Sequence, residues 1–241
     1  MWIVSVAAAG LLASTGGAAV ASPDYELAYW TMNEAPGART MRDVSGNGFH
    51  GRIGEDVAVG LRAGDRIAYG FERLEPDTPP ARPGHVVLVD DDSRLDPGER
   101  DYAIEMRLRT RDHFGNIVQK GQATVRGGSF KLQIPNGRVQ CWFRGSRTSL
   151  LATAPRPIND GEWHLVRCSR TGDGVSLSID GRVVAERPGW TGPIANSWPI
   201  AIGGKTDCDQ VDVGCDYFAG DIDYIAIDVA QPDRQGAEPD W

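Results

Sequence analysis

The chain has 241 residues, of which 41% are hydrophobic and 24% charged, and its formal net charge at pH 7 is −8. This composition is typical of a folded globular domain and excludes a disordered acidic tail or a membrane-spanning bundle. The sequence pI is about 5.0. Proteins that neutralise phosphate backbones show clustered Lys and Arg and a high pI, so we expect no nucleic-acid partner.

The N-terminal segment has the pattern of a secretory signal. The first 23 residues carry no ionisable side chain, and the run of apolar and small residues ends in Ala19-Val20-Ala21. A small-x-small ending of this kind is typical of a signal-peptide cleavage site, so we expect residues 1–21 to be removed after Ala21. About 20 apolar residues can also span a bilayer, which leaves a membrane anchor as the alternative. With cleavage, the mature chain has no predicted span, and we expect it to be secreted, extracellular or cell-surface associated.

Strand signals recur along the rest of the chain, and Gly and Pro interrupt nearly every window in which a long helix could form. In Tyr102–Arg109, alternate residues share one apolar face while the other face is mostly charged, which predicts a half-buried antiparallel strand. Val175–Ile179 alternates in the same way, and Asp180-Gly181 predicts a tight hairpin turn into the next run. The predicted strands, in chain order, are Tyr25–Met32, Ile67–Phe71, His85–Val89, Tyr102–Arg109, Asn116–Lys120, Phe130–Ile134, Arg138–Phe143, Glu162–Arg170, Val175–Ile179, Arg182–Ala185, Pro199–Gly203 and Phe218–Asp228.

About a dozen strands without helical cover must bury their apolar faces against one another. The sequence therefore predicts an all-β fold, a two-sheet antiparallel jelly-roll sandwich. The Pro-rich stretch Glu75–Pro83 could be an interdomain linker, but the segments on either side contain too few strands to close separate sandwiches. We interpret it as a surface loop within one domain, residues 22–230. The polar segment 231–241 is expected to be a flexible tail.

Four cysteines in a secreted chain predict two disulfides, for which three connectivities exist. Cys208 and Cys215 bracket a polar loop with little apolar content, so a short bridge there would fix the turn. Cys141 would then pair with Cys168, since both lie in strand-like runs that could be neighbours. A zinc site would need ligands in close pairs such as C-x2-C, and the chain has no such pair.

Four segments, taken in order, resemble the laminin G-like branch of the concanavalin A-like lectin/glucanase superfamily. They are Trp30–Glu34 with Gly37, Asp43–Gly51, Trp163–Val166 with Leu177–Gly181, and Phe218–Asp223. Each motif alone is weakly specific, and the four in this order are more so. The resemblance covers about residues 24–229 and implies a concanavalin A-like jelly roll in which the first and last strands pair.

A structural calcium ion is the cofactor that this pattern predicts. Period 2 along the last predicted strand places Asp223 on the core-facing side, where an unpaired charge is costly and a cation is the natural partner. Oxygen ligands could come from Asp43 and Asn47 if their loop packs beside that strand. The resemblance implies a calcium site of this kind and a carbonyl ligand, which we assign to His50. The alternative is that Asp43 and Asn47 form Asx-turns and that Asp223 caps a turn.

No catalytic pattern is present in the sequence. The glucanase relatives carry their carboxylates as Glu-x-Asp-x-(x)-Glu on one strand, and this chain has no such run, no Gly-x-Ser-x-Gly elbow and no His-Glu-x-x-His motif. We expect a monomeric, non-catalytic binding domain for carbohydrate or for an extracellular protein. The alternatives are a divergent glycoside hydrolase of the same fold and a structural accessory domain at the cell surface.

Sugar rings stack on exposed aromatic side chains, so aromatic residues in predicted turns and strand ends are candidates for a carbohydrate-binding site. Each of the tryptophans chosen on this basis is also explained as a packing residue. The candidate ligand-binding residues are Trp142, Arg144, Trp190 and Trp198.

Overall fold

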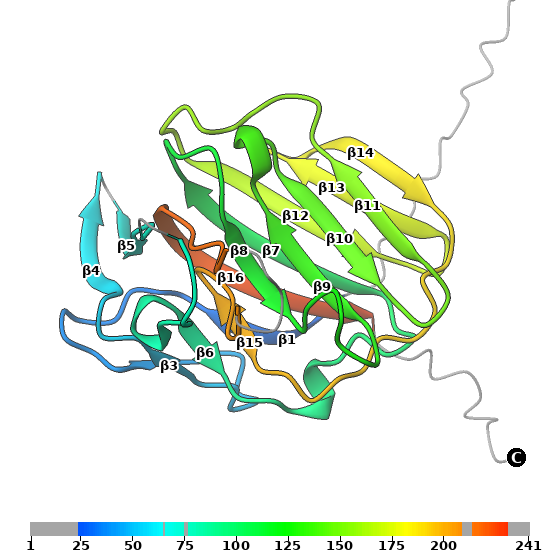
Figure 1. The fold of residues 1–241 in the computed structure, drawn as a ribbon, viewed down its shortest axis with the longest axis horizontal. Helices are drawn as coiled ribbons and strands as arrows, with labels where there is room; N and C mark the ends of the chain where they lie inside the picture. The colour runs from blue at the N-terminus through cyan, green and yellow to red at the C-terminus, as the bar shows by residue number, and fades with distance from the viewer. Residues whose placement is uncertain (1–23, 65, 75–76, 209–213, 231–241) are drawn as a thin grey trace, which may run out of the picture.

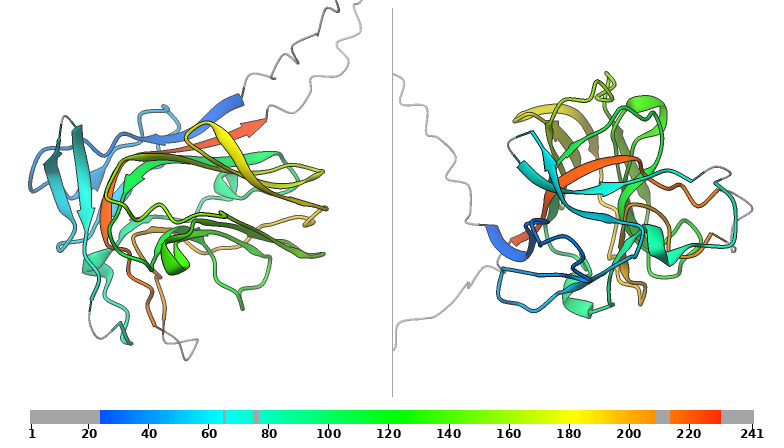
Figure 2. Two further views of the ribbon diagram at one scale, coloured as in Figure 1. Left: turned by 90° about the horizontal axis from the view of Figure 1, so that it is seen from above. Right: turned by 90° about the vertical axis from the view of Figure 1, so that its left-hand side faces the viewer.

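The computed structural model describes residues 24–64, 66–74, 77–208 and 214–230. Two antiparallel sheets of eight strands each pack face to face, so the predicted all-β sandwich is confirmed (Figures 1 and 2). The helical segments of the described residues are three 3₁₀ turns. The predicted signal peptide, residues 1–21, and the predicted tail, residues 231–241, lie outside the described residues.

The first sheet, called sheet A, has β7 and β16 at its centre, and β1 pairs with β16 as well. The first and last described strands therefore pair, as expected. The strands of sheet A, in spatial order, are β14 (Arg182–Pro188), β13 (Gly174–Ile179), β12 (His164–Arg170), β7 (Tyr102–Arg109), β16 (Gly220–Ala230), β5 (Arg66–Phe71) and β4 (Ala58–Ala63), with β1 (Asp24–Trp30) beside β16.

The second sheet, called sheet B, faces sheet A across the core. Its strands, in spatial order, are β11 (Ser149–Thr153), β10 (Gln140–Arg144), β9 (Ser129–Gln133), β8 (Asn116–Lys120), β15 (Ile200–Ile202), β6 (Val87–Val89), β3 (Gly51–Ile53) and β2 (Thr40–Met41). The 3₁₀ turns are η1 (Pro83–His85), η2 (Ser93–Leu95) and η3 (Pro135–Gly137).

The core lies between the sheets and is built from the inward faces that strand alternation predicts. Alternate residues of β7 from Tyr102 to Leu108 are buried. The Tyr102 ring centroid is 5.5 Å from that of Phe130 and 6.4 Å from that of Phe143, so aromatic rings from both sheets interlock. Trp30 is fully buried, and its indole nitrogen donates to the Phe49 carbonyl at 2.7 Å.

Cys141 and Cys168 form a disulfide that joins the two layers. Cys141 lies on β10 of sheet B and Cys168 on β12 of sheet A, and both are fully buried. The predicted pairing is present, but the two strands face each other across the core rather than lying side by side in one sheet. The disulfide therefore fixes the sheets to each other at one place in the core.

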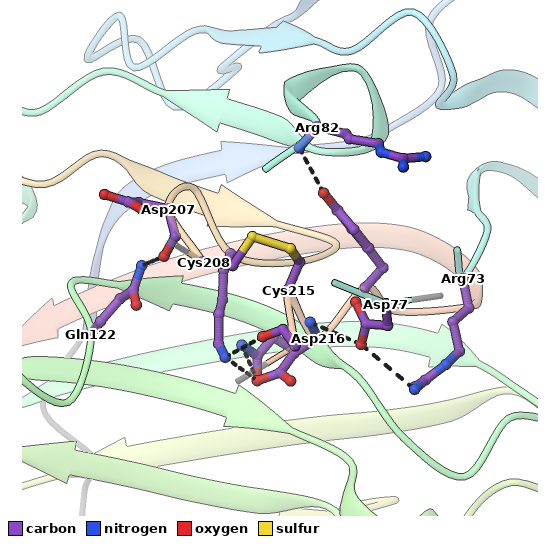
Figure 3. Close-up of a disulfide and its surroundings, with 12 residues drawn as sticks. Arg73, Asp77, Arg82, Gln122, Asp207, Cys208, Cys215 and Asp216 are labelled. Carbon is purple, nitrogen blue, oxygen red and sulfur yellow. Dashed lines mark hydrogen bonds and ion pairs between the residues drawn. A yellow bond between two sulfur atoms is a disulfide. The ribbon is translucent and has the colours of Figure 1, made fainter. Parts of the chain in front are cut away.

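The second predicted disulfide, Cys208–Cys215, fixes a loop outside the main core (Figure 3). The Asp77 carbonyl accepts a hydrogen bond from the Cys215 amide at 3.3 Å, and the Asp77 carboxylate accepts one from the Asp216 amide at 3.1 Å. Tyr217 accepts a hydrogen bond from the Arg82 amide at 2.7 Å. The described part of the Pro-rich stretch thus packs against this disulfide loop.

Replacing both Cys141 and Cys168 by Ala should lower the free energy of unfolding by about 3.5 kcal/mol, the chain-entropy value for a separation of 27 residues. The Cys208→Ala/Cys215→Ala variant is the matched control. Its separation is 7 residues, and its expected loss is about 2.4 kcal/mol. Urea unfolding of the three proteins measures both values. A larger loss in the control would contradict the importance of the link between the sheets.

His164, at the start of β12, lies between two carboxylates. Its Nδ1 is 2.8 Å from Asp180 Oδ2, and its Nε2 is 3.2 Å from Asp160 Oδ1. Burial opposes the charged imidazolium, but the hydrogen bonds to Asp180 and Asp160 outweigh burial and raise the pKa of His164 above its ordinary value.

Because the pKa of His164 is raised on folding, its stabilising contribution is complete below the unfolded-state pKa of 6.5 and is lost as the pH rises through the folded-state value. We expect His164→Gln to reduce the free energy of unfolding more at a pH about one unit below 6.5 than at about pH 8.5. Urea unfolding of both proteins at the two pH values checks this. An equal loss at both would show that the imidazolium is not stabilised by the two aspartates.

Candidate functional site

The edge of β16 that faces away from β7 is shared by two strands. Residues 220–222 pair with β5, and residues 225–230 pair with β1. Between these two ladders, the register of β16 against β7 shifts between Ile222 and Tyr224, which is a β-bulge. A cavity of about 500 Å³ lies where β1 ends and β5 begins, beside the bulge. We call it the notch; its lining residues are Tyr29, Thr31, Asn33, Arg66, Ile67, Arg107, Asp223 and Tyr224.

The bulge reverses the predicted orientation of Asp223. Ile222 and Ile225 are both fully buried, so the two residues between them lie on the outer side of β16. The Asp223 side chain is 16% exposed and faces the notch. The prediction that Asp223 points toward the core was wrong, because a bulge inserts one residue and interrupts the period of two.

Two arginines face the Asp223 carboxylate. Arg66 Nη1, from β5, is 2.8 Å from Asp223 Oδ2, and Arg107 Nη1, from β7, is 3.6 Å from the same oxygen. The charge of Asp223 is therefore compensated by guanidinium groups from two neighbouring strands. These planar donors keep further N–H groups for a ligand in the notch.

Two tyrosines form the aromatic part of the notch. The Tyr29 ring packs edge-on against Tyr224, with centroids 5.8 Å apart and planes at 85°. The Tyr224 hydroxyl donates to Glu105 Oε1 at 2.8 Å, and Arg107 Cζ lies 5.7 Å from the Tyr224 ring centroid. Burial, then the hydrogen bond and charge of Glu105, raise the pKa of Tyr224. Burial, then the charge of Glu26, raise the pKa of Tyr29. Both phenols stay protonated and neutral near neutral pH.

The notch combines groups that suit a ligand with both hydroxyls and apolar C–H faces. The tyrosine rings and Ile67, which is 41% exposed, offer apolar contact. Arg66 and Arg107 offer N–H donors, and Asn33 adds an amide. Concave sites that bind small ligands have this mixture of aromatic surface and a few fixed polar groups.

The predicted calcium ligand Asp43 is already engaged by backbone groups. Its carboxylate accepts hydrogen bonds from the amides of Tyr29 at 3.0 Å, Ser45 at 3.0 Å and Phe49 at 2.9 Å. Burial opposes the charge of this carboxylate, but these hydrogen bonds outweigh burial and lower the pKa of Asp43. The bond from Ser45 is the Asx-turn that the sequence left as the alternative.

The side chains of the other predicted ligands also have partners in the chain. The Asn47 side-chain amide donates to the Leu27 carbonyl at 2.9 Å, and His50 Nδ1 accepts from the Asp43 amide at 3.0 Å. Asp223 faces the arginines of the notch instead. Within the described residues, no cluster of three His, Cys, Asp or Glu side chains could hold a metal ion. Asp43 and Asp223 are thus held by different partners, and calcium binding by these residues and the His50 carbonyl stays a prediction.

Asp43→Asn should lower the free energy of unfolding by about 1–3 kcal/mol, because an amide cannot accept all three backbone hydrogen bonds as an ionised carboxylate does. The loss should be the same in excess calcium and in EDTA, after prior removal of bound metal. Thermal unfolding in the two buffers measures this. If wild type gains stability from calcium and Asp43→Asn does not, the carboxylate is a metal ligand after all.

The four predicted ligand-binding residues lie outside the notch. Trp142 is half-buried on the outer face of sheet B, and Lys131 Nζ is 5.4 Å from its ring centroid. Arg144 donates to two backbone carbonyls, which is a packing role. Trp190 is 37% exposed, and Trp198 is half-buried. A ligand role for these residues stays a prediction.

Of the residues that line the notch, sequence reasoning selected Asp223 alone, and it did so as a metal ligand. The alternation of Tyr102–Arg109 places Arg107 on the outer face, and Tyr29 lies in a predicted strand, so both signals were present. Arg66 and Asp223 are separated by 157 residues, and no local pattern predicts that they meet.

Comparison with known proteins agrees with this fold. The family model of the laminin G domain matches residues 108–228, half of the chain, and the chain therefore belongs to the laminin G domain family. Sex hormone-binding globulin from Phodopus sungorus is 30% identical over 101 residues. That match covers 40% of this chain and 25% of the globulin, so the chain spans a small part of this relative.

Solved structures with the same fold include domains of a laminin chain, of an arabinanase and of a neurotoxin. The LG4-5 domains of the mouse laminin α1 chain match with a TM-score of 0.54 and 18% identity, over 73% of this chain and 46% of that one. Domain 4 of AbnA, an extracellular arabinanase from Geobacillus stearothermophilus solved in complex with arabinotriose, matches with a TM-score of 0.59 and 15% identity, over 86% and 93%. The binding domain of botulinum neurotoxin serotype D matches with a TM-score of 0.54 and 14% identity, over 85% and 46%. At these identities the likeness establishes the fold alone.

Among the residues that the structure describes, none belongs to a helix long and apolar enough to cross a bilayer.

Proposed function

We propose that this laminin G domain is a secreted, non-catalytic carbohydrate-binding domain and that the notch is its sugar-binding site. The observation that carries the proposal is the notch itself, which places two neutral tyrosines beside the guanidinium groups of Arg66 and Arg107. Sugars offer C–H faces to aromatic rings and hydroxyls to planar donors and acceptors, so each wall of the notch has a matching part of the ligand.

Two further observations support this proposal. The AbnA domain, which this chain covers over 93% of its length, was solved with an oligosaccharide, so a domain of this fold can hold such a ligand. The apolar N-terminus and the two disulfides are typical of secreted proteins, and glycans are abundant outside cells.

The two carboxylates that β16 places on the outer face of sheet A are better suited to binding a ligand than to hydrolysing it. A glycoside hydrolase needs one carboxyl group as acid and a second as nucleophile or base. Asp221 accepts a hydrogen bond from Arg109 at 2.7 Å, and Asp223 accepts one from Arg66 at 2.8 Å. Both carboxylates are held by arginines, which favours their use as acceptors for sugar hydroxyls.

A glycan array followed by calorimetric titration with the glycans that bind tests this proposal. Tyr224→Ala removes an aromatic face of the notch and should weaken binding about tenfold, the equivalent of 1.4 kcal/mol. Arg66→Gln removes a charged donor and should weaken binding to a similar extent. No reducing ends should be released from any bound glycan.

Trp142→Ala, on the outer face of the other sheet, is the discriminating control. We expect it to bind glycans as wild type does. If Trp142→Ala loses binding and Tyr224→Ala binds fully, the sugar-binding site lies on sheet B and the proposal for the notch is wrong. Hydrolysis that disappears on removing a carboxylate would replace the binding role with a glycosidase.

A further inference from the structure

Lysine is rare in this chain, and the few lysines lie in or beside sheet B. Of the 25 basic residues, three are lysines. They are Lys120 on β8, Lys131 on β9 and Lys205 shortly after β15. An unprotonated lysine amine is a nucleophile, whereas an arginine guanidinium stays protonated in proteins. Amine chemistry on side chains is therefore limited to three positions, and the fold gives them different environments.

Lys120 has no amine available for reaction. Its side chain is fully buried, and Nζ lies 2.7 Å from Asp91 Oδ1 and 2.8 Å from Asp96 Oδ1. The Asn196 carbonyl accepts a third hydrogen bond from Nζ at 2.6 Å. An ammonium group has three N–H donors, and these three acceptors use all of them. Loss of the proton would leave two buried carboxylates without their cation, so this amine stays charged and enclosed.

Lys205 is held in a similar way next to the Cys208–Cys215 disulfide. Its side chain is 6% exposed, and Nζ lies 2.7 Å from Asp216 Oδ2. The same Nζ donates to the Gly214 carbonyl at 2.6 Å. This amine is also paired and shielded from solvent.

Lys131 differs from both. It lies on the outer side of sheet B, because its chain neighbours Phe130 and Leu132 are fully buried on the inner side. Its side chain is half-buried, and among the described residues Nζ has neither a hydrogen-bond acceptor nor an ion-pair partner. Nζ is not one of the fully enclosed polar atoms that lack a partner, so it keeps contact with solvent. Lys131 therefore carries the one accessible lysine amine of the described residues.

The side chains around Lys131 offer an aromatic surface and no carboxylate partner. Trp142 of β10 and Gln119 of β8 are its cross-strand neighbours. Nζ lies 5.4 Å from the Trp142 ring centroid, within the range of a cation–π contact. Gln119 is neutral and accepts a hydrogen bond from Asn116 at 3.1 Å. Arg144, the next outward residue of β10, donates to two backbone carbonyls.

Burial lowers the pKa of the Lys131 amine below its ordinary value of 10.5. The charge of Asp216 opposes this lowering, and the charge of Lys205 adds to it. Asp216 and Lys205 form an ion pair with each other, so their effects on Lys131 partly offset. Near neutral pH, the unprotonated and nucleophilic fraction of this amine is larger than that of an ordinary lysine.

We propose that Lys131 is a nucleophilic lysine that captures aromatic aldehydes reversibly, as an imine stacked on Trp142. The lone pair of Nζ adds to the aldehyde carbon, the carbonyl oxygen leaves as water, and a C=N bond forms. Amine and aldehyde thus give imine and water, with no oxidant or reductant. The protonated imine keeps a positive charge beside Trp142, and the planar ring of the ligand can pack on the indole. This site lies on sheet B and does not depend on the notch.

Labelling of the folded protein with salicylaldehyde, in the presence of sodium cyanoborohydride to reduce the imine, tests this proposal. Peptide mapping should find the adduct at Lys131 and not at Lys120 or Lys205. The rate at Lys131 should be several-fold higher than that of Nα-acetyl-lysine amide at the same pH. It should rise with pH to a midpoint below 10.5. In guanidinium chloride all three lysines should be labelled equally, because the folded environments are lost.

Two variants separate the nucleophile from its aromatic neighbour. Lys131→Arg keeps a cation beside Trp142 and should abolish lysine labelling in the folded protein. Trp142→Ala should slow labelling by salicylaldehyde more than labelling by propanal, since only the aromatic aldehyde stacks. Equal labelling of the three lysines in the folded protein, or a rate at Lys131 no higher than that of Nα-acetyl-lysine amide, would overturn the nucleophile. Equal slowing for the two aldehydes would overturn the preference for an aromatic ligand.

Discussion

One edge of β16 pairs with two different strands, and this constraint determines the arrangement of side chains on the outer face of sheet A. β5 takes the first residues of this edge and β1 the last, so the residues between them have no strand partner there. A β-bulge absorbs the mismatch by adding one residue on the outer side. Asp223 is thereby turned outward and placed between Arg66 and Arg107, and the same local geometry leaves the space that Tyr29 and Tyr224 line.

The two sides of sheet A contribute differently to stability. The inner side packs aromatic rings against sheet B and carries Cys168 of the disulfide between the sheets. The outer side carries partly buried ion pairs that keep contact with solvent, such as Arg109–Asp221 and Arg167–Asp228 at 2.7 and 2.5 Å. Ion pairs in contact with solvent contribute about 0–1 kcal/mol each when exposed, so we expect these pairs mainly to orient side chains. The outer face can therefore be specialised for a ligand at little cost to folding.

The sequence was informative wherever local pattern decides structure. Tyr102–Arg109 was predicted with its observed bounds because its alternation is regular and its inner face is buried. Both disulfide pairs followed from spacing and from the polar loop between Cys208 and Cys215. β11 was missed because Leu151 is an outward-facing apolar residue that interrupts alternation, and β4 was missed because it is irregular at Gly60.

The position and the lining of the notch could not be predicted from local sequence patterns. A bulge has no reliable sequence signature, so period 2 assigned Asp223 to the core and made a cation its expected partner. The partners are instead arginines of the chain, and Arg66 comes from a strand 157 residues away. The cavity depends on where β1 ends relative to β5, and only the assembled sheet determines that.

The central claim is that the bulge at Asp223 and Tyr224 creates the ligand site. It is tested most directly by titrating isotope-labelled protein, with assigned backbone resonances, with the glycan that binds most tightly on the array. The account predicts that saturable amide shift changes concentrate at Thr31, Asn33, Arg66, Asp223 and Tyr224, the lining of the notch. Changes that concentrate instead on β9, β10 and β11 around Trp142, with the notch unperturbed, would contradict it.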